Sequence, residues 1–130
     1  MYYKDFDKWN LVKQRINTEE HNISIRAGEV RWVSLGVNIG SEMDGKGISF
    51  TRPALIINIS GSSFALIVPM STKIHDKPGY LPMTFNNRQV ALCIHQTKVV
   101  SQKRIFSRLG RISDTKLKEY KNHIKHFFAL

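Results

Sequence analysis

Two polar residues stand at matching ends of two strongly apolar stretches, and both side chains suit the binding of phosphate. Arg52 precedes the apolar run from Pro53 to Ile59, and Ser71 follows the run from Phe64 to Val68. A guanidinium is a permanently charged planar fork for phosphate oxygens, and a hydroxyl both donates and accepts hydrogen bonds. A simpler alternative is that Arg52 pairs with a carboxylate and Ser71 caps a turn.

A β-hairpin would bring these two residues together. The apolar runs are joined by Ser60-Gly-Ser-Ser63, a sequence typical of a hairpin turn. With a loop of two or four residues centred on Gly61 and Ser62, the ladder places Arg52 directly opposite Ser71, on the same face. A loop of three residues or a bulge would shift this register by one residue.

The remaining strands follow from hydrophobic alternation. Residues 29–35 alternate as a strand, and a long glycine-bearing loop over 36–51 leads into the hairpin. Further strands are predicted at 81–85, 89–93 and 107–112. The expected fold is α+β and mainly β, a small and strongly curved sheet or barrel with a helix at each end of the chain.

Helices are predicted near both termini. Residues 4–18 carry apolar side chains at helical spacing behind Asp5 as N-cap, and residues 114–128 do so behind Ser113 or Asp114. A single helical turn is expected at 101–104. We expect residues 1–25 to form a helical extension that docks on the main domain, 26–130, or binds a partner.

The charge of the chain is strongly positive and unevenly distributed. The 130 residues include 20 Lys+Arg and 10 Asp+Glu, a net charge of +10, and the last 33 residues carry most of the excess. Such an excess favours an anionic partner, most simply nucleic acid, although a solvated helix face would produce the same pattern.

Composition excludes several classes of protein. No apolar run approaches the roughly 20 residues of a membrane helix, and the N-terminal residues lack a secretory hydrophobic segment. Cys93 is the only cysteine, which excludes an internal disulfide and fits a reducing compartment. We therefore expect a cytoplasmic protein of one main domain without a membrane segment.

Other chemical motifs are weak. His123 and His126 are spaced for one helix face, but no further ligand completes a metal site. Cys93 lies in an apolar strand and is expected in the core. The sequence contains no phosphate-binding glycine loop, dinucleotide fingerprint or zinc spacing, so we expect neither a metal nor a cofactor.

An ordered set of segments carries a resemblance to a known family. The main segments are Arg26-Ala-Gly-Glu-Val-Arg-Trp-Val-Ser-Leu35, Gly40-Ser-Glu42, Arg52-Pro-Ala-Leu-Ile-Ile57 and Val68-Pro-Met-Ser-Thr-Lys73. The stretches 92–96, 98–105 and 110–113 and the closing helix extend the match to about residues 26–128. This set resembles the MazF/PemK family of toxin endoribonucleases.

The resemblance implies an SH3-like small barrel of the CcdB/PemK type with a C-terminal helix. It also implies the toxin of a type II toxin–antitoxin system, which cleaves single-stranded RNA, often messenger RNA, without a metal. The expected products are a 2′,3′-cyclic phosphate and a 5′-hydroxyl. The implied partners are RNA, a second copy of the chain and a small antitoxin that occupies the RNA groove.

The resemblance also assigns roles to residues. The family's catalytic arginine falls on Arg52, and its catalytic threonine or serine falls on Ser71. The residues expected to contact RNA are Ser41, Glu42, Thr72, Lys73 and Gln96. Many family members have threonine where this chain has Ser71, which keeps the hydroxyl but loses a methyl group.

Cleavage by the ribose 2′-hydroxyl needs a group that transfers protons. Arg52 stays protonated, so Glu42 and His95 are the candidates. A structural role is the alternative for each of them: Glu42 would order its loop, and His95 would be a ring at the sheet edge. The aromatic residues that could stack on bases, or else anchor the core or a loop, are Phe50, Tyr80 and Phe85.

Two other functions fit the same sequence. One is a non-catalytic binding module on the same fold, such as a CcdB-like inhibitor of DNA gyrase or an RNA-binding module. The other is a basic ribosome-associated SH3-like domain, for which the charge alone suffices. A CcdB-like inhibitor would not need the pair Arg52 and Ser71, which favours the nuclease.

Overall fold

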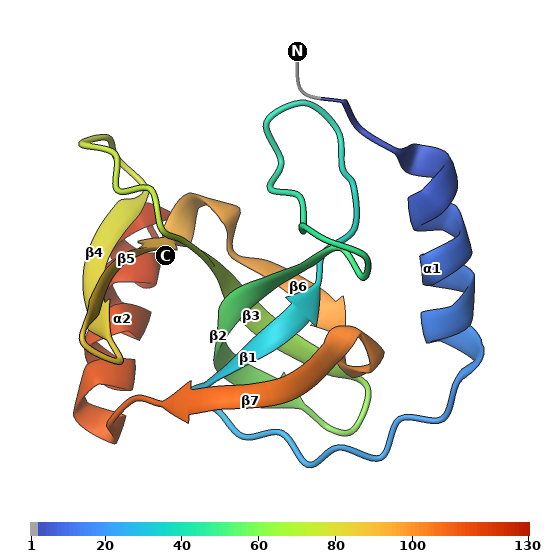
Figure 1. Ribbon diagram of the computed structural model, residues 1–130. Helices are drawn as coiled ribbons and strands as arrows, with labels where there is room; N and C mark the ends of the chain where they lie inside the picture. The colour runs from blue at the N-terminus through green and yellow to red at the C-terminus, as the bar shows by residue number, and fades with distance from the viewer. Residues whose placement is uncertain (1–2) are drawn as a thin grey trace.

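The computed structural model describes residues 3–130, in which a strongly bent antiparallel sheet lies between two helices (Figure 1). The strands are β1 (Glu29–Ser34), β2 (Thr51–Ser60), β3 (Phe64–Ser71), β4 (Tyr80–Phe85), β5 (Arg88–Cys93), β6 (Lys98–Ser101) and β7 (Ile105–Arg111). Their order in the sheet is β4-β5-β3-β2-β1-β7, and β6 pairs with β3 beside this path. The helices are α1 (Phe6–Thr18) and α2 (Asp114–Phe127).

The predicted elements are confirmed, with ends that differ by a few residues. Asp5 caps α1 by accepting a hydrogen bond from the amide of Lys8, and Ser113 caps α2 by accepting one from Lys116. The helical turn lies at Gln102–Arg104. Strand β6 was not predicted, because it is short and only Val100 in it is buried. No helix in residues 3–130 is long and apolar enough to cross a membrane.

The α+β class is confirmed, but the expected small barrel is not closed. Among the described strands, β4 and β7 end the path, and no ladder joins them. The ring of Phe85 packs on Gly110 instead: a Cβ at Gly110 would lie 2.7 Å from its Cζ. A side chain between two edges keeps their backbones further apart than the about 4.8 Å of paired strands.

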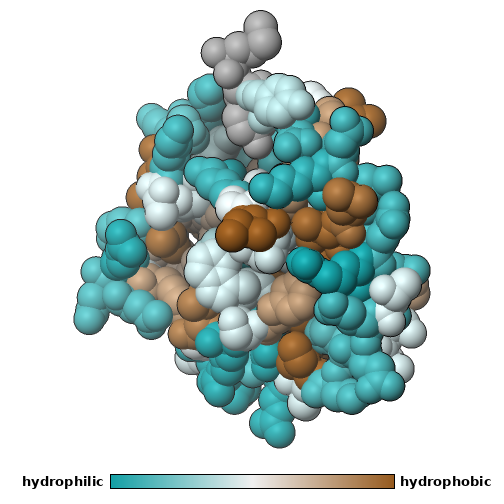
Figure 2. All heavy atoms as spheres, turned by 45° about the vertical axis from the view of Figure 1, so that its right-hand side comes forward, coloured by the Kyte–Doolittle hydropathy of each residue, from teal (hydrophilic) through white to brown (hydrophobic). Residues whose placement is uncertain are grey.

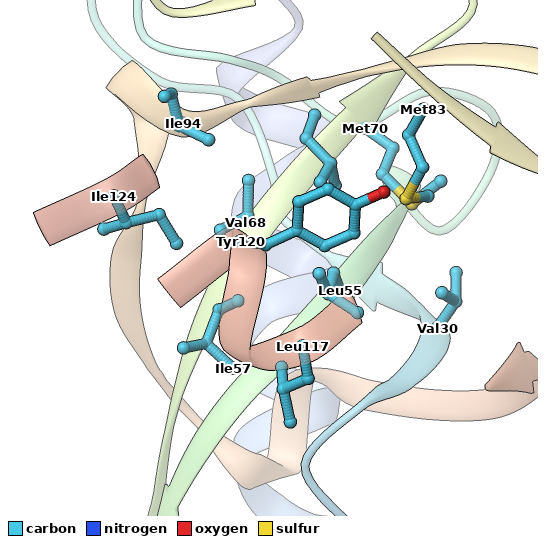
Figure 3. Close-up of a cluster of buried hydrophobic side chains, with 11 residues drawn as sticks. Val30, Leu55, Ile57, Val68, Met70, Met83, Ile94, Leu117, Tyr120 and Ile124 are labelled. Atoms are coloured by element: carbon cyan, nitrogen blue, oxygen red, sulfur yellow. The ribbon is translucent and has the colours of Figure 1, made fainter. Parts of the chain in front are cut away.

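Helix α2 covers one face of the sheet and supplies much of the core. Leu117, Tyr120 and Ile124 are buried, and they pack in a cluster with residues of β2 and β3 such as Leu55 and Val68. In Figure 3 these side chains point from the helix toward the strands. Burial of apolar surface stabilises the fold by about 25 cal/mol per Å², and this free energy holds the helix on the sheet.

Helix α1 docks on the domain, which confirms one of the two expected roles of the extension. Trp9 and Val12 are buried against Val37 and Phe50, which belong to the segment between β1 and β2. A Cβ at Gly36 would lie 2.2 Å from the Trp9 ring, so only glycine permits this contact. On the side of the molecule shown in Figure 2, separate hydrophobic side chains lie among hydrophilic ones.

The β2–β3 hairpin reaches the predicted register by an unexpected route. The loop has three residues, so Ser60 pairs with Phe64, one residue away from the predicted pairing. A bulge between Ile56 and Asn58 restores the register, and Ala54 pairs with Pro69 as predicted. The two shifts cancel, and the open end of the hairpin is aligned as the sequence suggested.

Candidate active site

A pocket of about 560 Å³ opens beside the start of β2 and the end of β3. Its lining residues are Trp32, Lys46, Gly47, Thr51, Arg52, Pro53, Met70, Ser71, Thr72, Phe85, Asn86, Arg88, Val90 and Leu109. We call it the Arg52 pocket. Three of these side chains are cationic, and no described lining residue is a carboxylate or a histidine, so the pocket suits an anionic ligand with an apolar part.

Arg52 is held in a fixed orientation within this pocket. It lies in β2 opposite Val33 of β1. Its Nε–H donates to the main-chain carbonyl of Asp44 at 2.5 Å. The bond uses the Nε–H of the guanidinium and leaves both Nη groups, which can donate two hydrogen bonds to one phosphate.

Ser71 lies in the same pocket, as the hairpin predicted. It pairs with Ala91 of β5, and its Oγ accepts a hydrogen bond from the amide of Lys73 at 3.1 Å. Because that bond uses a lone pair of Oγ, the hydroxyl hydrogen is left to donate to a ligand. Thr72 also lines the pocket, whereas Lys73 is exposed outside the lining.

The other predicted site residues lie in a second depression of about 470 Å³. We call it the Gln96 depression; its lining residues are Leu35, Ser41, Glu42, Met43, Pro69, His95, Gln96, Thr97 and Lys98. It contains both candidates for proton transfer, Glu42 and His95. The structure therefore divides the predicted residues between two neighbouring sites instead of gathering them in one.

Gln96 and Glu42 hold the loop between β1 and β2. Gln96 Oε1 accepts from the amide of Met43 at 3.2 Å, and its Nε2 donates to the carbonyl of Ser41 at 3.1 Å. Glu42 Oε1 accepts from the amide of Ile39 at 3.0 Å. The structural role expected as the alternative for Glu42 is thus present, and Gln96 has a comparable one.

His95 is oriented by a main-chain contact. Its Nδ1 lies 3.1 Å from the carbonyl oxygen of Gly79, and its ring packs on Tyr80 at 4.8 Å between centroids. A carbonyl can only accept, so Nδ1 carries the hydrogen and Nε2 of the neutral ring carries the lone pair. A Cβ at Gly79 would lie 2.5 Å from Nδ1, so this contact needs glycine.

Trp32 is a site residue that the sequence did not reveal. It lines the Arg52 pocket with 37% of its surface exposed. Strand alternation over residues 29–35 does not show that Trp32 borders a pocket, whereas Val30 on the same strand is fully buried. Phe85 also lines the pocket, whereas Phe50 is buried against Trp9 and is a core anchor.

Cys93 is a core residue, as expected. It is fully buried in β5, and burial raises the pKa of its thiol to about 11 despite the nearby charge of Arg52. A thiol in that state is a poor nucleophile. In residues 3–130, no three His, Cys, Asp or Glu side chains converge as a metal site.

Comparisons with known proteins agree on one family. The family model described as PemK-like, MazF-like toxin of type II toxin-antitoxin system matches residues 26–128. No curated protein sequence matches the chain.

Three similar solved structures show the same fold. MazF from Deinococcus radiodurans covers 84% of this chain and 100% of its own at 14% identity and a TM-score of 0.66. The match with the Mycobacterium tuberculosis toxin MazF-mt6 covers 78% of this chain and 97% of that one, at 13% identity and a TM-score of 0.59. The match with a mycobacterial endoribonuclease in complex with its cognate antitoxin covers 82% of this chain and 97% of that one, at 13% identity and a TM-score of 0.59.

Proposed function

This chain belongs to the family of PemK-like, MazF-like toxins of type II toxin-antitoxin systems, and on that premise we propose that it is a metal-independent endoribonuclease. It cleaves single-stranded RNA, including messenger RNA, at short sequence motifs in the cytoplasm. The observation that carries this proposal is the Arg52 pocket, where an oriented guanidinium and a hydroxyl with an available hydrogen lie in one cationic cavity.

The reaction is attack of a ribose 2′-hydroxyl on the adjacent phosphorus. The bond from phosphorus to the 5′-oxygen breaks, leaving a 2′,3′-cyclic phosphate and a 5′-hydroxyl. Arg52 stabilises the negative charge that builds up on the phosphoryl oxygens, with its two Nη groups as donors. Ser71 donates its hydroxyl hydrogen to one of those oxygens and fixes the phosphate relative to the guanidinium.

Proton transfer is assigned to the neighbouring depression. His95 in its neutral form presents Nε2 as an acceptor and can take the proton of the 2′-hydroxyl. Glu42 is the second candidate, with one carboxylate oxygen already bonded to the amide of Ile39. The proton lost by the nucleophile is returned to the 5′-oxygen as that bond breaks.

RNA binds across both sites. The residues proposed to contact it come from the loop, from the segment after β3 and from the short helical turn after β5; they are Ser41, Glu42, Thr72, Lys73 and Gln96. The exposed lysines of α2 add long-range attraction for the RNA backbone. A cognate antitoxin occupies the same surface, and the active form is a homodimer. The mycobacterial endoribonuclease solved with its cognate antitoxin supports an antitoxin as a partner.

The test is cleavage of a defined single-stranded RNA by the purified protein in EDTA, followed by mapping of both ends. We expect 2′,3′-cyclic phosphate and 5′-hydroxyl ends from the wild type, and far less of both from Arg52→Ala in the same time. Arg111→Ala is the matched control, since it removes an exposed arginine that pairs with Asp114 outside the pocket. Intact RNA that is still bound would instead indicate a non-catalytic binding module.

A further inference from the structure

We propose that Lys4, in the segment before α1, is a positioning residue for the Arg52 guanidinium and acts through Asp44. This inference rests on the proposed function, because it concerns the residue that stabilises the reacting phosphate. It gives the N-terminal extension a part in the cleavage of RNA.

The ammonium of Lys4 contacts three oxygen atoms of the loop between β1 and β2. Its Nζ donates to the carbonyls of Asn38 at 2.6 Å and Gly40 at 3.0 Å, and it lies 3.4 Å from Oδ2 of Asp44. The side chain of Lys4 is 20% exposed and that of Asp44 only 8%. An ion pair so poorly solvated holds its geometry more firmly than a surface pair does.

Asp44 joins this cluster to the Arg52 pocket. Its Oδ1 accepts a hydrogen bond from the amide of Asn38 at 2.6 Å, which folds the loop on itself. Its main-chain carbonyl accepts the Nε–H of Arg52. Asp44 therefore contacts Lys4 through its buried side chain and Arg52 through its main-chain carbonyl. A change in the first contact displaces the residue and so moves the carbonyl that orients Arg52.

Helix α1 keeps Lys4 in place. Lys4 directly precedes the N-cap Asp5, and one turn later Trp9 packs on Gly36 and Phe50, at the two ends of the loop. The loop is thus held by packing at its base and by an ammonium at its tip. Lys4 and α1 lie outside residues 26–128, so this support is an addition to the family's domain.

Loss of the ammonium would act on Arg52 at a distance. The buried carboxylate of Asp44 would lack its cation and would move toward water, and its carbonyl would move with it. A displacement of about 1 Å in a catalytic group costs up to about 100-fold in rate. Because Lys4 lines neither site, the loss should fall mainly on kcat, with a smaller effect on substrate binding through Ser41 and Glu42 of the same loop.

The experiment compares Lys4→Met with Lys103→Met in the full chain. Lys103 also contacts the N-terminal extension: its Nζ donates to the carbonyl of Asn17 at 2.7 Å, at the C-terminal end of α1. With a short single-stranded RNA, we expect Lys4→Met to lower kcat at least about 10-fold while KM changes less than about twofold. Lys103→Met should keep the wild-type kcat, and Lys4→Arg should recover most of the loss.

A second readout does not depend on activity. Hydrogen exchange of the Arg52 Nε–H, followed by NMR, should accelerate in Lys4→Met and stay slow in Lys103→Met, because only the first variant loosens the carbonyl of Asp44. Equal behaviour of the two variants in kcat and in exchange would overturn the role of Lys4. If the wild type does not cleave RNA, the proposed function fails, and the Nε–H exchange still decides whether Lys4 fixes Arg52.

Discussion

The Arg52 pocket and the Gln96 depression are bordered by different parts of one loop, and they use their polar side chains differently. In the first, Arg52 and Ser71 each spend one hydrogen bond on the main chain and keep further donors for a ligand. In the second, Gln96 uses both ends of its amide on the loop itself. Gln96, which the family resemblance led us to expect in RNA binding, therefore holds one wall of its depression in this structure.

The largest effect is expected in the Arg52 pocket. Arg52→Ala should lower the initial rate of RNA cleavage by about 100- to 1000-fold, because the charge of the reacting phosphate loses its oriented donors. Arg52→Lys should recover only a small part, since an ammonium lacks the fork geometry. Initial rates measure both, with circular dichroism to show that the fold is kept. A rate for Arg52→Ala within a few-fold of wild type would remove Arg52 from the chemistry.

A smaller loss is expected at Ser71. Ser71→Ala removes one donor to the phosphate and should lower the rate about 10- to 100-fold, while Ser71→Thr keeps the hydroxyl and should retain most activity. The measurement is single-turnover cleavage at saturating enzyme. If alanine is as fast as serine, Ser71 only orders the turn through the amide of Lys73.

Trp32 tests whether the apolar wall of the pocket binds a base. Trp32→Ala should weaken RNA binding about tenfold, the usual worth of a base stacked on an aromatic ring, while Trp32→Phe should keep most of the affinity. Fluorescence anisotropy with an uncleavable analogue carrying 2′-deoxy at the scissile position reads the affinity alone. Unchanged affinity in the alanine variant would show that Trp32 only closes the pocket.

The smallest effect is expected in the Gln96 depression. Gln96→Ala removes two hydrogen bonds worth about 1 kcal/mol each and should lower the rate about fivefold through a looser loop. Gln96→Glu should fall between alanine and wild type, since it keeps the acceptor for the amide of Met43 and loses the donor to Ser41. Amide exchange over residues 39–43 should rise in step. Weaker RNA binding without faster exchange would make Gln96 a direct contact.

The sequence predicted which residues meet at the open end of the hairpin, but not the turn and the bulge that bring them there. The placement of Arg52 and Ser71 at one end of the hairpin followed from strand alternation, yet the turn and the bulge near Ile57 were not visible. Both are local backbone choices that differ little in energy and leave no mark on hydrophobic pattern. The prediction survived because the two shifts have opposite directions.

Long-range support of the loop was beyond sequence reasoning. The bonds from Gln96 to Met43 and from Lys4 to Gly40 join residues 53 and 36 positions apart. No periodicity or turn rule specifies such a pair, because it depends on the three-dimensional path of the chain. The same holds for Trp32, whose exposure depends on the pocket beside it.

The docking of α1 also bears on how the protein is made. The helix is synthesised before every residue that holds it, and two of these contacts come from residues much later in the chain: Arg104 lies over the Trp9 ring at 5.6 Å, and Lys103 bonds to Asn17. Domains assemble as synthesis supplies their parts. Under the proposed function, a nascent toxin acquires its fully anchored site only after Lys103 and Arg104 have been added to the chain.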